Sequence, residues 1–177
     1  MGSFCSILII ATLFHTAQGQ DIPASYHDLI RKVKEINIDT TLQQMILHNE
    51  DFISPSPDGG GELTGFFKQD QIQKVTRQIW LSNGIEVYDY YFTEGKLIFV
   101  YETFRSFTYS LELDEFDYSK TELSFVGRYY FSDNKLIDLE TTGHNRFEDD
   151  TMNIEKVLIT ESNENVQKLQ KSMRTQR

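Results

Sequence analysis

Few residue types that bind metals or act as nucleophiles occur in this chain. Its histidines are His15, His27, His48 and His144, and its one cysteine is Cys5. No two of the last three histidines stand at the spacing of a metal site, and no second cysteine supplements them. The chain also lacks the Gly-x-Ser-x-Gly motif of a nucleophilic serine. The sequence therefore predicts no metal, no cofactor and no catalytic residue.

Acidic residues gather in two places. One cluster is Glu112, Asp114, Glu115 and Asp117, in a long link between predicted strands, and the other is 148–150, before the last helix. Either could supply oxygen ligands for calcium, but neither has the order of a calcium-binding loop. We interpret both as solvated segments, with 149–150 also suited to the N-terminal end of a helix. Carboxylates that meet only in the folded chain support an alternative, hydrolase-like hypothesis.

Aromatic residues are unusually dense in the middle of the chain, where they fill 18 of the 66 positions from Phe66 to Phe131. Core filling and cross-strand pairing are the ordinary explanation. The alternative is an exposed sheet face whose tyrosines bind an apolar or saccharide ligand, or a protein partner. The candidates for such a strip are Tyr88, Tyr90 and Tyr101. We expect residue 88 to pair with 101, 90 with 99 and 92 with 97 across one hairpin.

The charge balance limits the classes of partner. The 177-residue chain has 17 basic and 27 acidic residues and a formal net charge of −10. Phosphate groups of nucleic acids, and anionic membrane surfaces, attract a basic face. The expected partner is therefore a protein or a small or saccharide ligand, and not a nucleic acid.

The first residues have the pattern of an export signal. Phe4 to Phe14 form an apolar run of 11 residues, which suits a signal peptide and is too short to span a bilayer. Ala17 and Gly19 are small residues at positions −3 and −1 of a cut before Gln20. We expect a signal peptide at 1–19, one domain at 20–177 and no membrane span after cleavage.

Two lipidation patterns compete with this interpretation. Gly2 with Ser6 fits a loose myristoylation pattern, but the apolar run behind it fits export better. Cys5 lies before or within that run, whereas a lipoprotein cysteine follows it. Cleavage after Gly19 would remove the only cysteine, so the mature chain would hold itself together without an internal disulfide. Small secreted eukaryotic domains usually have disulfides, which favours a bacterial periplasmic or secreted protein.

Helical periodicity marks both ends of the chain. Apolar residues recur at helical spacing from Ser25 to Ile36, which predicts a helix that packs on a sheet. Met152 to Arg177 has similar spacing, although 156–160 could instead be a last strand. The segment 41–48 is ambiguous between strand and helix. Ser54 to Gly61 has two prolines and three glycines, and we interpret it as a flexible link, since it lacks the Gly-Lys-Ser/Thr of a phosphate loop.

One pattern occurs three times between the two helices. The pattern occupies segments 65–72, 90–97 and 129–136. Each segment has an aromatic pair followed by two polar residues. Next comes Asp70, Gly95 or Asn134, then a long polar residue and an aliphatic one. Asp, Gly and Asn tolerate the positive φ that short hairpin loops require, so each segment is predicted to be a β-hairpin. Asn83-Gly84 marks a fourth turn.

These turns predict an α+β fold with a single antiparallel meander of about six strands, at 62–68, 71–81, 85–92, 96–105, 121–131 and 135–142. Strand 96–105 is apolar on both faces and should be central, with something packed on each side. In strand 121–131, Leu123, Phe125, Tyr129 and Phe131 alternate with polar residues and should share one face. We expect both helices to cover the same face of the sheet.

Four stretches between Gly59 and Gly143 carry a family resemblance: Gly60–Gly65, Leu81–Gly84, Tyr90–Phe92 with Lys96–Glu102, and Gly127–Phe131. In these stretches the chain resembles uncharacterised exported proteins of Gram-negative bacteria. The hairpin unit is also loosely similar to variant membrane-occupation-and-recognition repeats. The resemblance to the exported proteins implies export and an antiparallel fold, and neither resemblance implies catalytic residues.

The function expected from these features is that of an exported, non-catalytic binding or interaction module. The alternative is a hydrolase-like enzyme whose carboxylates meet in the fold. A concave pocket that holds two carboxylates, or a histidine and an acid, would favour the enzyme. An exposed tyrosine patch without such a pocket would favour binding.

Overall fold

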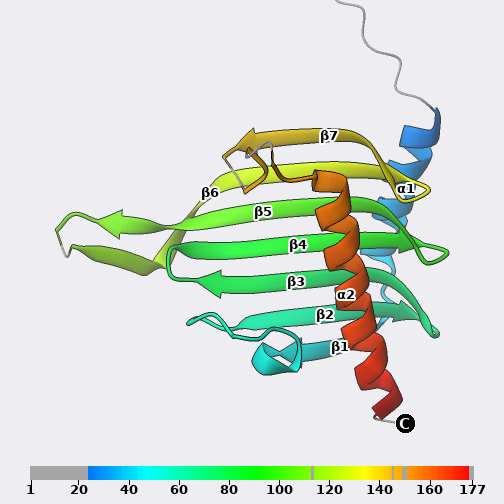
Figure 1. The fold of residues 1–177 in the computed structure, drawn as a ribbon, viewed down its shortest axis with the longest axis horizontal. Helices are drawn as coiled ribbons and strands as arrows, with labels where there is room; N and C mark the ends of the chain where they lie inside the picture. The colour runs from blue at the N-terminus through cyan, green and yellow to red at the C-terminus, as the bar shows by residue number, and fades with distance from the viewer. Residues whose placement is uncertain (1–23, 113, 145, 149–150, 176–177) are drawn as a thin grey trace, which may run out of the picture.

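The computed structural model describes residues 24–112, 114–144, 146–148 and 151–175, so the expected signal peptide lies outside the described residues. The described chain begins with a helix, forms a seven-stranded sheet and ends with a second helix (Figure 1). The elements are α1 (Ala24–Ile38), β1 (Gln43–His48), the 3-10 turn η1 (Asn49–Asp51), β2 (Gly61–Lys68), β3 (Gln71–Leu81), β4 (Gly84–Thr93), β5 (Lys96–Ser110), β6 (Glu115–Ser132), β7 (Lys135–Gly143), the 3-10 turn η2 (Arg146–Glu148) and α2 (Ile154–Thr175).

The sheet is an antiparallel meander in which each strand pairs with its neighbours in sequence. The α+β class and the antiparallel meander are confirmed, and the six predicted strands are present. A seventh strand, β1, forms from the ambiguous segment 41–48. The other ambiguous segment, 156–160, lies within α2 and is not a strand. Among the described residues, neither helix combines the length and apolarity needed to cross a membrane.

Positive φ angles close the predicted hairpins. Glu94 and Gly95 have φ of 52° and 76°, and Asp133 and Asn134 have 49° and 58°. Two consecutive residues at positive φ give the turn whose twist matches that of paired strands. In the hairpin of segment 65–72 the positive φ, 57°, falls on Gln69 and not on Asp70 as expected.

Each of these hairpins also contains a β-bulge at its aromatic pair. The pairing shifts between Phe66 and Phe67, between Tyr91 and Phe92, and between Tyr130 and Phe131. The extra residue lies on the following strand, and an extra residue moves all later pairs by one position. The second ring of each pair belongs to one core cluster: these rings are Phe67, Phe92 and Phe131. In two of the pairs the first ring, Tyr91 or Tyr130, belongs to a second core cluster.

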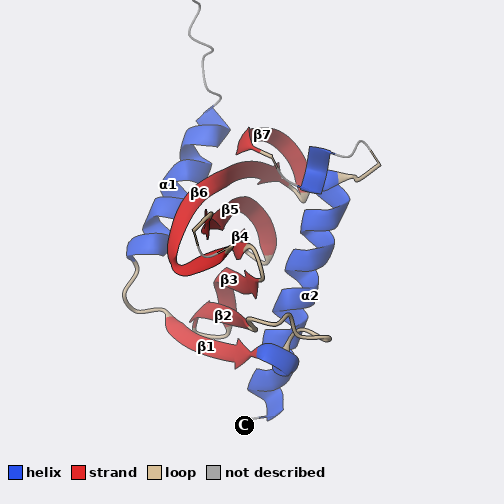
Figure 2. Ribbon diagram, turned by 90° about the vertical axis from the view of Figure 1, so that its left-hand side faces the viewer, coloured by secondary structure: helices blue, strands red, loops and turns tan. Residues whose placement is uncertain are grey.

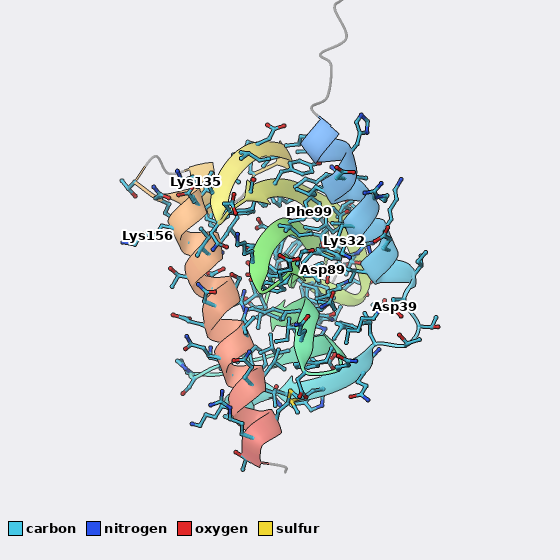
Figure 3. The ribbon with its side chains drawn as sticks, turned by 90° about the vertical axis from the view of Figure 1, so that its right-hand side faces the viewer. Lys32, Asp39, Asp89, Phe99, Lys135 and Lys156 are labelled. Atoms are coloured by element: carbon cyan, nitrogen blue, oxygen red, sulfur yellow. The ribbon has the colours of Figure 1, made fainter. Side chains whose placement is uncertain are left out.

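The two helices lie on opposite faces of the sheet (Figure 2), so the expectation that they share one face is wrong. The sheet between them has apolar residues on both faces, as predicted for strand 96–105, and each face requires its own cover. Leu97 and Val100 of β5 belong to the cluster under α2, whereas Ile98 and Phe99 belong to the cluster under α1. Figure 3 shows Phe99 between the strands and α1.

The helices pack through the stripes that their periodicity predicts. Tyr26, on α1, lies over Tyr130 with ring centroids 4.5 Å apart. On α2, Leu158 and Leu169 are fully buried against the sheet. A Cβ at Gly65 would lie 2.9 Å from Leu169 Cδ1, so the missing side chain lets α2 approach β2 closely.

Strands β5 and β6 extend further than predicted and project beyond the rest of the sheet (Figure 1). The projecting part, residues 107–118, is called the arm below. The arm thus forms most of what was predicted to be a link between strands 96–105 and 121–131. The arm's strands carry aromatic residues at every second position: Phe107 and Tyr109 on β5, and Phe116 and Tyr118 on β6. The pairing also shifts next to Leu123, which is exposed, so it does not share a buried face with Phe125.

Candidate functional site

The three tyrosines proposed for ligand binding do not form one strip. Tyr88 and Tyr90 are 0% exposed in the cluster under α2, whereas Tyr101 packs with the α1 cluster. The predicted pairing of 88 with 101 and of 90 with 99 is wrong, because Tyr88 pairs with Glu102 and Tyr90 with Val100. The bulge beside Phe92 causes this shift, and only the pair of residue 92 with residue 97 matches the prediction.

Tyr88 instead belongs to a buried polar cluster. Its hydroxyl and that of Tyr129 each donate a 2.7 Å hydrogen bond to the carboxylate of Glu102, and Glu102 is only 3% exposed. Burial raises the pKa of the Glu102 carboxyl, although the two hydrogen bonds act in the opposite direction. Burial likewise raises the pKa of Tyr88. The cluster is internally satisfied, so its geometry suits a structural role in the core.

A second polar contact joins this cluster to α2. Both terminal nitrogens of Arg146 donate 2.7 Å hydrogen bonds to Glu161, and the Tyr90 hydroxyl donates to the same carboxylate at 3.3 Å. The Arg146 guanidinium also lies 5.2 Å from the centroid of the Tyr88 ring. These contacts hold the segment before α2, the helix and the sheet together.

An open, aromatic pocket lies at the end of the sheet near the arm. Its volume is about 670 Å³, and we call it the distal pocket; its lining consists of Asp58, Gly59, Trp80, Leu81, Ser82, Ile85, Phe107 and Tyr118. The amide of Phe107 donates a 2.9 Å hydrogen bond to the Asn83 carbonyl, which ties the arm to the β3–β4 turn. A Cβ at Gly59 would lie 2.5 Å from Trp80 Cβ and 2.6 Å from the Trp80 carbonyl oxygen, so the glycine lets loop 58–59 pack against the backbone of β3.

The arm presents aromatic and aliphatic side chains to solvent. The rings of Phe107 and Tyr118 meet edge to face at 4.9 Å, and those of Tyr109 and Phe116 at 5.3 Å. Tyr118 is nevertheless 64% exposed, and Leu111 near the tip is 91% exposed. A two-stranded ribbon is only marginally stable by itself. Apolar side chains that lie together and exposed on such a ribbon are typical of an interaction surface.

Acidic residues belong to the same segments as these rings. Asp58 lines the distal pocket, and Glu112, Asp114, Glu115 and Asp117 lie on the arm. Hydrogen bonds from Lys120 and Ser119 lower the pKa of Asp117 to about 2, so it is ionised at neutral pH. The arm and the distal pocket therefore form an aromatic surface with an acidic rim.

Metal ligands do not gather within the described part of the chain, where no three histidine, cysteine or acidic side chains are placed to hold an ion. His48 lies 3.8 Å from Glu62 and both side chains are substantially exposed. On the α1 face, the charged pair Lys74 and Asp89 is satisfied at 3.0 Å, with Lys74 also over the Tyr91 ring.

Sequence reasoning missed the residues that form the distal pocket. Trp80, Phe107 and Tyr118 come from three segments that only the long β5–β6 hairpin brings together. The period-two aromatic pattern of the arm was the signal that could have revealed it.

No protein-family model, curated protein or solved structure matches this chain.

Proposed function

We propose that this protein is a non-catalytic interaction module that binds a protein partner through the distal pocket and the arm. The observation that carries the proposal is the pocket of about 670 Å³ lined by Trp80, Phe107 and Tyr118. Interaction sites are enriched in aromatic anchors and in pockets that receive them. Pocket and arm adjoin, because Phe107 and Tyr118 belong to both.

The exposed residues of the arm favour a protein over a small ligand. Tyr109, Leu111 and Tyr118 project beyond the sheet, where a small molecule in the pocket would leave Leu111 uncovered. The acidic rim adds charge complementarity, so the partner presents an apolar or aromatic side chain flanked by Lys or Arg. Such a partner covers the arm and neutralises the rim at the same time.

The hydrolase alternative has less support. One polar depression between the sheet and α2 contains Glu161 and Glu164, but Arg146 and Tyr90 already occupy the Glu161 carboxylate. Glu102 is buried and its two tyrosine partners satisfy it. Neither carboxylate is free to act on a substrate in this arrangement.

Export to the periplasm or the medium is part of the proposal. Its support is the apolar run with Ala17 and Gly19 at the start of the chain. Protein recovered from the native cells should begin at Gln20. N-terminal sequencing that finds Met1 on cytoplasmic protein would refute export and leave the binding proposal standing.

A peptide-display selection tests the binding proposal. Peptides selected on the wild-type chain should combine an aromatic residue with Lys or Arg, and should lose affinity on Phe107→Ala and Tyr118→Ala. Tyr101→Ala, which changes a ring packed against the α1 cluster and outside both the distal pocket and the arm, is the matched control. Binding that persists in both arm variants would reject the site, and selective binding of oligosaccharides to it would replace the protein partner with a saccharide.

A further inference from the structure

The two edges of the sheet differ in how readily they could accept a further strand. β1 and β7 are the outer strands, so one side of each has no neighbouring strand within the described part of the chain. The backbone N–H and C=O groups on such a side can pair with another chain. Natural proteins protect these edges with charged side chains, prolines, bulges or covering groups.

The β7 edge is protected in several of these ways. Its sequence KLIDLETTG includes three charged side chains, and its pairing with β6 contains a bulge. Two of its backbone amides already donate to carboxylates, Leu136 N to Glu155 Oε2 at 2.8 Å and Leu139 N to Asp138 Oδ1 at 2.9 Å. A strand added at this edge would have to displace these contacts.

The β1 edge lacks the charges, prolines and bulges that would protect it. Its sequence, QQMILH, has no Asp, Glu, Lys, Arg or Pro, and all six residues pair with β2 without a register shift. Ile46 is also 45% exposed there. A regular and uncharged edge of this kind is suited to strand addition, in which backbone hydrogen bonds supply the affinity.

Charges of opposite sign lie at the two ends of β1. At one end η1 directly follows the strand and carries the exposed Glu50 and Asp51. The other end lies beside the β2–β3 turn, because β1 and β2 are antiparallel. The last turns of α2, with the exposed Lys171 and Arg174, lie at that same turn, where Asp70 and Arg174 line one depression (Figure 1).

We propose that two copies of this chain form a dimer by antiparallel pairing of their β1 edges. A twofold axis at Ile46 places this residue opposite its own copy, and Met45 opposite Leu47 of the second copy. Residues directly opposite each other point to the same face of a sheet. Since Met45 and Leu47 both belong to the core cluster under α2, the apolar face continues from one copy into the other.

The charges around β1 favour a second copy as the occupant. The chain has a formal net charge of −10, so two copies repel each other over most of their surfaces. The β1 edge brings an uncharged strand into the contact. The same twofold axis places η1 of each copy beside the α2 end of the other, so Glu50 and Asp51 lie near Lys171 and Arg174 twice in the dimer.

This dimer is independent of the proposed binding function. β1, η1 and the end of α2 share no residue with the arm or with the distal pocket. A monomeric protein could still bind a partner through the distal pocket, and a dimer could form without one.

Analytical ultracentrifugation over a concentration series tests the proposal, and the wild type should dimerise. Ile46→Lys should weaken the dimer about tenfold or more, because it places two like charges at the twofold axis. The monomer should stay folded, since the Ile46 side chain is substantially exposed. The matched control is Ile137→Lys, the same substitution at a 50% exposed position on β7, which should leave the dimer unchanged.

Charge reversal at the ends of β1 gives a second test that leaves the sheet intact if Ile46→Lys does not fold. Glu50→Lys with Asp51→Lys should weaken the dimer, and Lys171→Glu with Arg174→Glu should do the same. All four substitutions in one chain should restore it, because opposite charges then face each other again.

Three results would overturn the proposal. The first is a wild type that stays monomeric at the highest soluble concentration. The second is a dimer that Ile46→Lys leaves intact. The third is a fourfold charge-reversal variant that dimerises no better than the two pairs of reversals do separately.

Discussion

Arg146 and Glu161 form two parallel hydrogen bonds of 2.7 Å that join the segment before α2 to the helix itself. The pair is partly buried, with side chains 32% and 25% exposed. The Arg146 guanidinium also lies over the ring of Tyr88, whose hydroxyl donates to Glu102. The ion pair therefore connects α2 to the buried polar cluster around Glu102.

Removal of Arg146 should therefore destabilise the protein. Arg146→Ala leaves the Glu161 carboxylate partly buried without a cation and removes the contact with the Tyr88 ring. We expect a loss of about 2 kcal/mol in the free energy of unfolding, between the values for exposed and for buried ion pairs. Urea denaturation measures it. Lys96→Ala is the control, since the Lys96–Asp133 pair is equally close at 2.6 Å but exposed, and should change stability little.

Truncation of Tyr88 should cost more. Tyr88→Ala empties a fully buried ring site and leaves Glu102 with one hydroxyl donor, so we expect a loss of about 3–5 kcal/mol. Tyr101→Ala should cost clearly less, because that ring is only half-buried on the other face. Equal melting temperatures of Tyr88→Ala and the parent would contradict the placement of Tyr88 in the core.

Glu102 should make stability depend on pH. Burial raises its pKa in the folded protein above its ordinary value of 4.5, so the folded state binds the proton more tightly than the unfolded chain. The resulting stabilisation is fully present below pH 4.5 and is lost as the pH rises through the raised pKa. The stability of the wild type relative to Glu102→Gln should thus increase as the pH falls from neutrality. Denaturation of both at several pH values checks this, and a constant difference would contradict it.

Gly95 tests the hairpin assignment. Its φ is 76°, and a Cβ built there meets no atom within 4 Å, so a substitution would cost only backbone energy. Gly95→Val should lose about 1–3 kcal/mol, because a β-branched residue resists positive φ. Gly95→Asn should lose less, since Asn tolerates this region. If the two variants melt at the same temperature, backbone strain does not explain the glycine.

Turn chemistry made much of the sheet predictable from the sequence. Gly95 and Asn134 marked hairpins that the structure contains, and the aliphatic residues on both faces of 96–105 indicated a covered central strand. The register was not predictable, because the extra residues Ile98 and Ile137 have no distinctive side-chain pattern. A bulge depends on backbone pairing, and one extra residue moved Tyr88 from Tyr101 to Glu102.

The candidate sites were harder to predict than the strands. The acidic residues of the arm suggested a solvated link, although Phe107 and Tyr109 alternate as in a strand. The segment 41–48 was ambiguous between strand and helix, so the sheet edge that β1 forms was not predictable either. Helical periodicity showed that α2 has a buried face, but not which face of the sheet receives it.

Trp80 provides the most direct test of the proposed function, because it is the only tryptophan of the chain and lines the distal pocket. Titration with a display-selected basic, aromatic peptide should change its fluorescence in a saturable way. The change should weaken as salt screens the acidic rim, and should be lost in Phe107→Ala and Tyr118→Ala but retained in Tyr101→Ala. A peptide that binds without altering Trp80 emission, or equally well in the arm variants, would contradict the account.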